Sequence, residues 1–296
     1  MDGLKETLDF WKEWLTWLTL GEWAEEAIRW LRSNLSPLWD FIEEVLGGAH
    51  QALTDALNFL PALVMVALLA LLAWYLRGWV FGLVSAVGLL LIDQMGQWEL
   101  AMFTLAMVIV AVVLAAAIAI PIGIAAARSR AVSTVVKPIL DFMQTLPGLL
   151  YVLVAVMFFG LGVVPGIVAT IIFAMPPGIR LTELGIRQVD AEVVEAGHAF
   201  GSTPGRILQQ IQFPLALPTI MAGVNQVIML SLSMVVLAAF VGAGGLGGGV
   251  VEGLSRLNYA LGFESGLSIV VLAIYLDRVT AALGARSAVA RLEKAA

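Results

Sequence analysis

The chain has 296 residues, of which 60% are hydrophobic and only 13% are charged, and it contains no cysteine. A soluble domain averages about 25% charged residues, and a water-soluble fold of this length could not bury so much apolar surface. The composition therefore predicts an integral membrane protein and excludes disulfide and thiolate chemistry. With two histidines and no basic cluster, we expect no metal site and no nucleic-acid partner.

Residues 1–58 form an acidic, tryptophan-rich tail with eleven Asp or Glu and four Lys or Arg. Trp11, Trp14 and Trp17 recur at helical spacing among charged residues, and residues 23–31 repeat the pattern. This pattern predicts amphipathic helices that lie in the membrane interface. The alternative is an ordinary amphipathic helix packed on its own protein. The acidic start, without a leading basic segment, argues against a signal peptide.

Apolar segments follow the tail and predict an all-α membrane fold of about seven transmembrane helices, with six as the alternative count. A helix needs roughly 20 residues to cross the hydrocarbon layer. The segments are 60–76, 79–92, 98–127, 139–161, 164–180, 215–241 and 264–284. We divide the chain into the tail 1–58, two accessory transmembrane helices in 59–95, a core in 96–285 and a C-terminal tail 286–296.

Lysine and arginine gather on one side of these predicted spans. When the loops alternate sides, only Arg256 and the four basic residues of the tail lie on the opposite side. The basic side is predicted to be cytoplasmic, so the N-terminus and the segment 242–263 lie outside and the C-terminus lies inside. The residues on the predicted cytoplasmic side are Arg77, Arg128, Arg130, Lys137, Arg180, Arg187, Arg206, Arg278, Arg286, Arg291 and Lys294.

The longest predicted cytoplasmic loop, residues 181–214, has the signals of two short helices. Asp190 is a plausible N-cap for a helix that runs through Phe200, and Gly201 fits the position just after it. Ser202 or Thr203 can cap a second helix with Pro204 in its first turn, and Pro214 is expected to end that helix near the membrane. The loop is therefore predicted to be helix, glycine break, helix.

This loop resembles the cytoplasmic loop of importer permeases of the ATP-binding-cassette class. Their motif is Glu-Ala-Ala, three residues, Gly, nine residues and Ile-x-Leu-Pro. The chain departs from it at Gly197 and Phe213. The resemblance implies a type I permease core of five helices and a loop that couples to a separate ATPase through Glu195, Ala196, Gly197, Phe200, Gly201, Ile211, Phe213 and Pro214. Small residues would let the partner approach, and Phe200 offers an apolar knob.

A second resemblance narrows the substrate class. The stretches 141–147, 173–182, 221–226 and 232–236 resemble permeases that import glycine betaine, proline betaine and related quaternary amines. This resemblance implies a bacterial inner-membrane homodimer that assembles with two ATPase subunits and an extracytoplasmic binding protein. It also implies that the ATPase subunits bind ATP and Mg. The chain itself has no phosphate loop, because the glycine run 242–249 lacks the following Lys and Ser or Thr. We expect that run to be a gate, a docking surface or a plain turn.

The predicted spans also contain candidate pathway residues. Pro147 beside Met143 and Thr145 is expected to form a pathway-lining bend. Asn225, Ser231 and Ser233 could bond a passing solute or, equally, join helices. Ionisable residues such as Asp141 and Asp277 sit near predicted span ends, and carboxylates are absent from the span centres, which favours an external energy source over a coupled carrier.

A secondary carrier or channel for osmolytes is the alternative function, and an intramembrane enzyme is disfavoured because no nucleophile–base pair is found.

Overall fold

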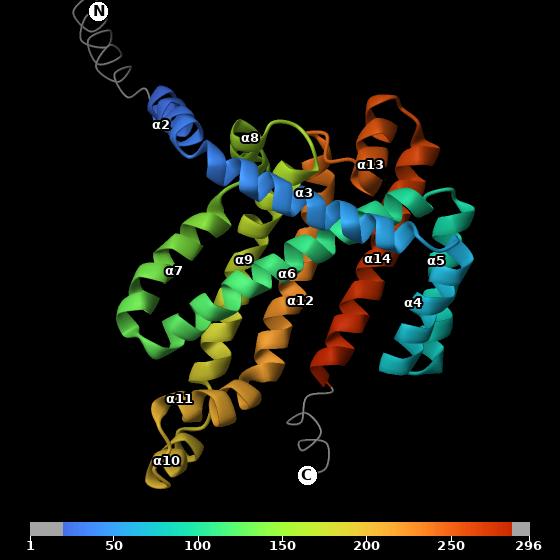
Figure 1. Cartoon of the computed structure of the whole chain (residues 1–296). Helices are drawn as coiled ribbons and strands as arrows, with labels where there is room; N and C mark the ends of the chain where they lie inside the picture. Colours follow the sequence, from blue (N-terminus) through green and yellow to red (C-terminus); the bar gives the residue numbers. More distant parts are fainter. Residues whose placement is uncertain (1–19, 286–296) are drawn as a thin grey trace, which may run out of the picture. The chain divides into compact units, whose positions relative to one another are not determined.

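The structure is a computed structural model that describes residues 20–285, and within that range it contains helices and no strand (Figure 1). Four of these helices are long and apolar enough to cross a membrane: α6, α9, the continuous helix from Pro204 to Ala239, and α14. Two sharply bent helix pairs raise the count to six if each pair is one span. The all-α membrane fold is thus confirmed, with four to six candidate spans.

Residues 20–44 form a compact unit separate from the remainder of the chain. It contains α2 (Leu20–Asn34) and the first part of α3 (Ser36–Asn58). Trp23 and Trp30 are exposed on α2, and the Trp39 indole donates a hydrogen bond to the Leu31 carbonyl at 3.0 Å. The predicted amphipathic helix over residues 23–31 is therefore present, whereas Trp11, Trp14 and Trp17 lie outside the described residues.

The second part of α3, residues 45–58, belongs to the larger unit and packs on its other helices. Leu46 and His50 are buried there. The His50 ring meets the Phe103 ring edge-on at 4.4 Å, and its Nε2 lies 3.2 Å from the Phe103 carbonyl oxygen. Residues 45–58, the end of the predicted tail, are therefore packed on their own protein, whereas the two alternatives above concern the tryptophan-rich stretches up to residue 31.

Two short apolar helices follow, α4 (Ala62–Arg77) and α5 (Trp79–Gln94). They pack against each other around Gly78, whose φ of 100° suits glycine. Each has 16 residues, which makes each about 24 Å long. These two predicted segments are therefore helical but short of the usual span length, and α4 is bent by 100° from α3.

The centre of the larger unit is built from α6 (Trp98–Arg128), α9 (Val163–Arg187) and α12 (Phe213–Ala239). Small residues line their contacts. A Cβ added at Gly123 of α6 would lie 2.5 Å from Thr182 Cβ of α9, and one at Gly185 of α9 would lie 2.9 Å from Thr219 Cβ of α12. Close backbone approach of this kind is how helices associate in lipid, where the hydrophobic effect does not drive them together.

The predicted span 139–161 is not one continuous helix. Its residues belong to α7 (Arg130–Thr145) and α8 (Gly148–Phe159), which meet at an angle of 99°. Leu146 has an extended backbone with ψ of 136°, because the ring of Pro147 disfavours the helical conformation in the residue before it. The proline that was expected to bend the span breaks it.

The predicted loop is shorter than expected and is joined to its following span. α9 continues to Arg187, so residues 181–187 are helix rather than loop. The loop contains α10 (Ala191–Ala199), α11 (Pro204–Ile207) and one π-helical turn, η1 (Leu208–Gln212). Pro214 does not end this helix, contrary to prediction. The chain runs through η1 into α12, and Phe213 N–H bonds to Leu208 O, five residues earlier, so the wider turn accommodates the proline.

The C-terminal part of the described chain is a hairpin of α13 (Gly245–Ser255) and α14 (Tyr259–Ala285). The glycine run 242–249 forms the turn before α13 at residues 242–244 and the first five residues of that helix, and it is tightly packed. Leu246 N–H donates to Thr104 Oγ1 at 2.8 Å, and a Cβ added at Gly247 would lie 2.4 Å from the Val235 carbonyl oxygen. Of the expectations for this run, the packed turn agrees with the structure, and the docking role is untested.

Candidate functional site

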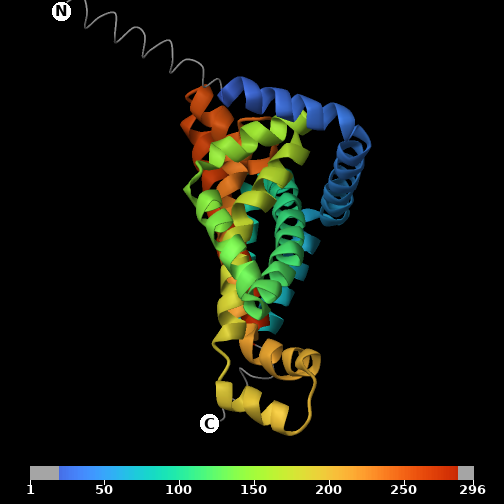
Figure 2. The same cartoon turned by 90° about the vertical axis from the view of Figure 1, so that its left-hand side faces the viewer.

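The first candidate site is the bent segment of α10, α11 and η1, residues 191–212, which we call the elbow. Asp190 caps α10 by accepting a bond from Glu192 N–H at 2.9 Å, and Thr203 caps α11 by accepting from Arg206 N–H at 3.5 Å. Both views show the elbow projecting beyond the ends of the long helices (Figures 1 and 2). The helix, glycine break and helix are as the sequence predicted, with Thr203 rather than Ser202 as the second cap.

Two positions of the elbow, 197 and 201, are glycine for different structural reasons. Gly201 has a φ of 75° and open space where a Cβ would lie, so the backbone conformation requires it. Gly197 is buried, and a Cβ there would lie 2.8 Å from Ile211 Cδ1. Gly197 lets α10 pack on the following helix, and the prediction that both glycines admit a partner stays a prediction. Each position therefore has a structural reason within the chain itself.

The outer face of the elbow presents the other predicted coupling residues. Phe200 is 90% exposed, which is extreme for a side chain that gains by leaving water. Glu195 and Ala196 are exposed beside it on α10. Ile211, Phe213 and Pro214 are half-buried where the elbow joins α12. An apolar knob on a rigid, protruding helix pair is a surface suited to docking in a partner's groove.

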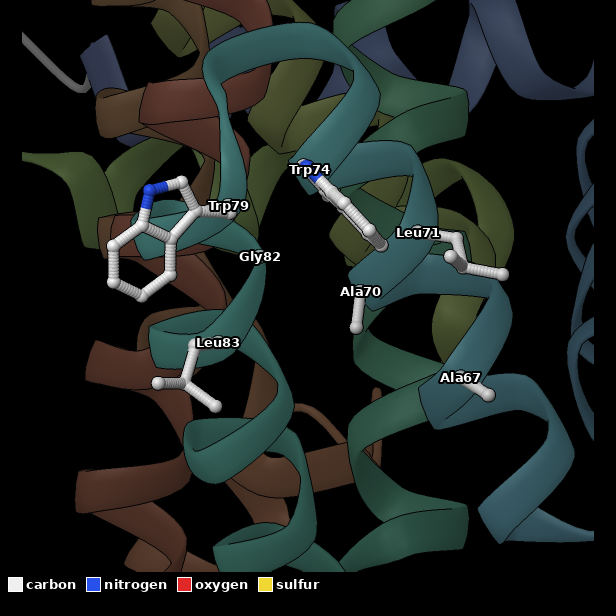
Figure 3. A pocket seen from close by; sticks show the side chains of 7 residues that line it. All are labelled: Ala67, Ala70, Leu71, Trp74, Trp79, Gly82 and Leu83. Carbon is white, nitrogen blue, oxygen red and sulfur yellow. The ribbon is translucent and has the colours of Figure 1, made fainter.

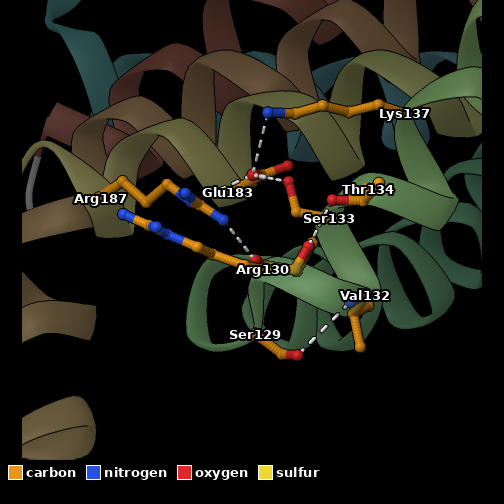
Figure 4. A network of polar contacts seen from close by, with 9 residues as sticks. Ser129, Arg130, Val132, Ser133, Thr134, Lys137, Glu183 and Arg187 are labelled. Atoms are coloured by element: carbon orange, nitrogen blue, oxygen red, sulfur yellow. Dashed lines mark hydrogen bonds and ion pairs between the residues drawn. The ribbon is translucent and has the colours of Figure 1, made fainter.

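A buried carboxylate ties the base of the elbow to the rest of the molecule, and sequence reasoning missed it. Glu183 of α9 is only 5% exposed. Its Oε1 accepts a bond from Ser133 Oγ at 2.8 Å and lies 3.6 Å from Lys137 Nζ and 3.0 Å from Arg187 Nε (Figure 4). Arg187 also donates to the Ala126 carbonyl oxygen at 2.8 Å.

These contacts, which we call the Glu183 cluster, join three helices, α6, α7 and α9, just before the chain leaves α9 for the elbow. The spacing of Glu183 and Arg187, four residues apart on one helix, was the available sequence signal. The partner residues on α7 come from about 50 positions earlier in the chain, and no local pattern could have found them.

The second candidate site is the break between α7 and α8, where Met143, Thr145 and Pro147 were predicted to lie. Pro147 has no N–H and cannot bond to the Met143 carbonyl oxygen as a helical residue would. The Tyr151 hydroxyl donates to that oxygen instead. Thr145 and Pro147 are exposed and Met143 is half-buried. The structure thus brings the three predicted residues together at a braced bend.

The three candidates on α12 point in different directions. Asn225 Nδ2 donates to Asp277 Oδ1 of α14 at 2.7 Å, so it joins two helices. Ser231 is fully buried and bonds to the Val227 carbonyl of its own helix, whereas Ser233 is exposed. Asn225 lies 12 residues from the start and 14 from the end of α12. Its partner Asp277 lies 8 residues before the end of α14.

The hairpin of α4 and α5 has a groove of about 600 Å³ that is unlike a solute path (Figure 3). Its lining is apolar, with Trp74 and Trp79 on its two walls and Gly82 between them. Apart from the indole N–H groups of the two tryptophans its lining is apolar, and it carries no charged side chain, so we do not place the pathway there. Over residues 20–285, no group of three His, Cys, Asp or Glu side chains is placed to hold a metal ion.

Comparison with known proteins decides the family. The family described as "Binding-protein-dependent transport system inner membrane component" matches residues 119–289, more than half of the chain and the whole of the elbow. The chain belongs to this family. It is a membrane-spanning permease subunit, as the motif at Glu195–Pro214 predicted, and ATP hydrolysis in such transporters is the work of a separate subunit.

The relatives of this permease have named solutes. It is 44% identical over 91% of its length to the glycine betaine/proline betaine transport system permease protein ProW of Escherichia coli, covering 76% of that protein. It is 43% identical to the glycine betaine permease OpuAB of Bacillus subtilis, over 89% of this chain and 93% of that one. It is 41% identical to the glycine betaine/carnitine permease GbuB of Listeria monocytogenes, over 91% and 97%.

The fold also matches a solved structure, an inward-facing conformation of the MetNI methionine ABC transporter. The TM-score is 0.53 over 62% of this chain and 90% of that chain, at 22% sequence identity. At that identity the match speaks to the fold alone, and it agrees with the predicted importer permease architecture.

Proposed function

We propose that this permease imports glycine betaine or a closely related quaternary ammonium solute, driven by ATP hydrolysis on partner subunits. The observation that carries the proposal is the elbow, a rigid helix pair with an exposed Phe200, in a chain 41–44% identical to three betaine permeases. The solute class rests on those relatives and on the stretches 141–147 and 173–182, which resemble betaine permeases.

The proposed complex has two copies of this chain, two ATPase subunits that bind ATP and Mg, and an extracytoplasmic binding protein. The elbow and the C-terminus face the cytoplasm, and the α13–α14 turn faces outward. The distribution of basic residues supports this orientation. The elbow would be the docking surface for the ATPase, with Phe200 as the apolar contact and Glu195 and Ala196 beside it.

Transport in this proposal is a change between inward-open and outward-open arrangements of similar free energy. Shifting such an equilibrium from 1:99 to 99:1 takes about 5.5 kcal/mol of differential binding. Closure of the ATPase dimer would supply this by moving the elbow, which is continuous with α12 and lies beyond the Glu183 cluster on α9. The long helices would then tilt as rigid bodies.

The proposal is tested by purifying the permease with its ATPase and binding protein and reconstituting the complex into liposomes. We expect uptake of radiolabelled glycine betaine that requires ATP, the binding protein and all subunits. Uptake by the permease alone, without the ATPase, would instead support the alternative of a secondary carrier or channel. Absence of glycine betaine uptake, with ATP-driven uptake of an unrelated solute, would refute the proposed solute class.

A further inference from the structure

One face of α7 carries a polar stripe that the proposed mechanism does not yet use. Thr134, Lys137, Asp141 and Thr145 are exposed and recur at spacings of three and four, so they lie on one side of the helix. A separate exposed stripe on the same helix is apolar and consists of Val135, Ile139 and Phe142. The apolar stripe suits lipid, and the polar stripe does not.

Asp141 in this stripe forms an ion pair with Arg180 of α9. Asp141 lies 11 residues, or about 16 Å, beyond the start of α7, and Arg180 lies 7 residues, or about 10 Å, before the end of α9, so the pair is away from the ends of both helices. The side chains of Asp141 and Arg180 are nevertheless 65% and 40% exposed. Charged side chains at such a depth face a water-filled cavity or the bundle interior rather than lipid.

The Arg180 guanidinium is not fully satisfied by Asp141. Its Nε is buried and has no hydrogen-bond partner. A guanidinium offers donors in a planar fork that a carboxylate can accept in pairs. The next cation along α7, Lys137, is held by Glu183. The Arg180 side chain is 40% exposed and keeps donors that Asp141 does not engage, although the Nε itself is closed to solvent and would need a side-chain rotation to reach a solute.

We propose that Asp141 and Arg180 form a transient site for a zwitterionic solute in the translocation pathway. The inference rests on the proposed function and adds the groups that contact the solute. Glycine betaine, proline betaine and carnitine, the solutes named for the relatives, each carry a quaternary ammonium and a carboxylate. Arg180 would bind the carboxylate and Asp141 would lie against the ammonium. Because the bound solute replaces one ion pair by two, the net gain in binding free energy is small. Weak binding suits a transport pathway, which needs a site that releases its solute.

The test uses the absence of cysteine from the chain. Thr145→Cys places one thiol on the polar stripe one turn from Asp141, and Phe142→Cys places one on the apolar stripe as a matched control. Each variant is assembled with its ATPase, embedded in lipid nanodiscs without nucleotide, and modified with a membrane-impermeant maleimide. We expect Thr145→Cys to react readily and Phe142→Cys to react slowly.

Glycine betaine is then added as the probe. When the glycine betaine concentration is about four times the dissociation constant of the site, one fifth of the sites are free. The rate of maleimide reaction at Thr145→Cys should therefore fall about fivefold. Equal concentrations of choline, which has only the cation, or of acetate, which has only the anion, should protect much less. Adding Arg180→Gln should abolish the protection, and Arg180→Lys should restore part of it.

Three results would overturn the proposal: an unreactive Thr145→Cys, equal protection by choline, or protection that persists with Arg180→Gln. Binding-protein-stimulated ATP hydrolysis by each variant serves as the check that the complex is folded and assembled. Because the labelling needs no transport, its failure is distinguishable from failure of the proposed function, which is judged by ATP-driven uptake in the unmodified complex.

Discussion

At the scale of single residues, the backbone conformation of Gly201 is proposed to be necessary for coupling to the ATPase. Any L-residue placed at its φ of 75° is strained by about 1–2 kcal/mol. We predict that Gly201→Ala lowers glycine betaine uptake per ATP hydrolysed by about 5- to 30-fold, because the elbow leaves the geometry that the ATPase engages. Uptake and phosphate release are measured together in proteoliposomes.

The matched control for this prediction is Gly205→Ala. Gly205 also has open space for a Cβ, but it lies in the first turn of α11 and its φ is not positive. This variant should transport as the parent does. If both alanine variants transport normally, the conformation of Gly201 is not needed for coupling.

Tyr151 is a second residue whose role follows from its neighbours. Its hydroxyl bonds to the Met143 carbonyl oxygen that Pro147 leaves without a donor. Tyr151→Phe should destabilise the permease by about 0.6 kcal/mol, the average for interhelical hydrogen bonds in a membrane protein, and by no more than about 1.7 kcal/mol, the maximum. It should also lower the maximal uptake rate, because the bend between α7 and α8 is less firmly held.

Tyr275→Phe is the control for the bend. Tyr275 donates an equivalent bond to the Leu69 carbonyl oxygen at 3.0 Å, away from the break. Both variants should lower the thermal unfolding temperature in detergent, and only Tyr151→Phe should slow uptake. Equal slowing by the two variants would indicate that the bond supports stability and has no role specific to the bend.

At the scale of the elements, the Glu183 cluster fixes the end of α9 that precedes the elbow. Glu183→Gln removes the negative charge shared by Lys137 and Arg187. We predict that this variant still assembles and hydrolyses ATP. Its glycine betaine uptake per ATP hydrolysed should be lower, because α9 is less tightly bound to α6 and α7 and transmits less of the elbow's motion to them. The control is Glu252→Gln, which breaks a solvent-exposed pair with Arg256 and should have little effect.

The elbow itself should bind the ATPase largely through Phe200. Burying a phenylalanine side chain contributes about 1.5–3 kcal/mol, so Phe200→Ser should weaken the affinity for the ATPase by about 10- to 100-fold. Affinity is measured by surface-captured permease titrated with purified ATPase subunit. Phe263→Ser, at a position also highly exposed but on α14, should bind as the parent does. An unchanged affinity for Phe200→Ser would place the contact elsewhere.

Elements differed in how well the sequence predicted them. The caps of α10 and α11 and the turn at Gly201 were predictable because each depends on neighbours within a few residues. The 99° break was foreseen only as a bend, since hydropathy over 139–161 is continuous across Pro147. The helix that continues through Pro214 was not predicted, because a π-helical turn has no sequence signature comparable to a cap.

At the scale of the whole molecule, composition and the positions of apolar segments predicted a helical membrane protein, and the loop motif predicted its family. Contacts between distant segments were beyond such reasoning. Ser133 and Glu183 are 50 residues apart, and Asn225 and Asp277 are 52 apart. Each of these carboxylates sits where local hydropathy gave no reason to place a buried or paired charge.

Transport as proposed requires that the elbow faces the cytoplasm and touches the ATPase. The most direct measurement is labelling of a single cysteine introduced as Phe200→Cys, compared with Ser255→Cys at the α13–α14 turn, using an impermeant maleimide on oriented membrane vesicles. We predict that Phe200→Cys reacts only in inside-out vesicles and is protected when purified ATPase is bound, while Ser255→Cys reacts only in right-side-out vesicles. Reaction of Phe200→Cys from the outer side, or no protection by the ATPase, would contradict the account.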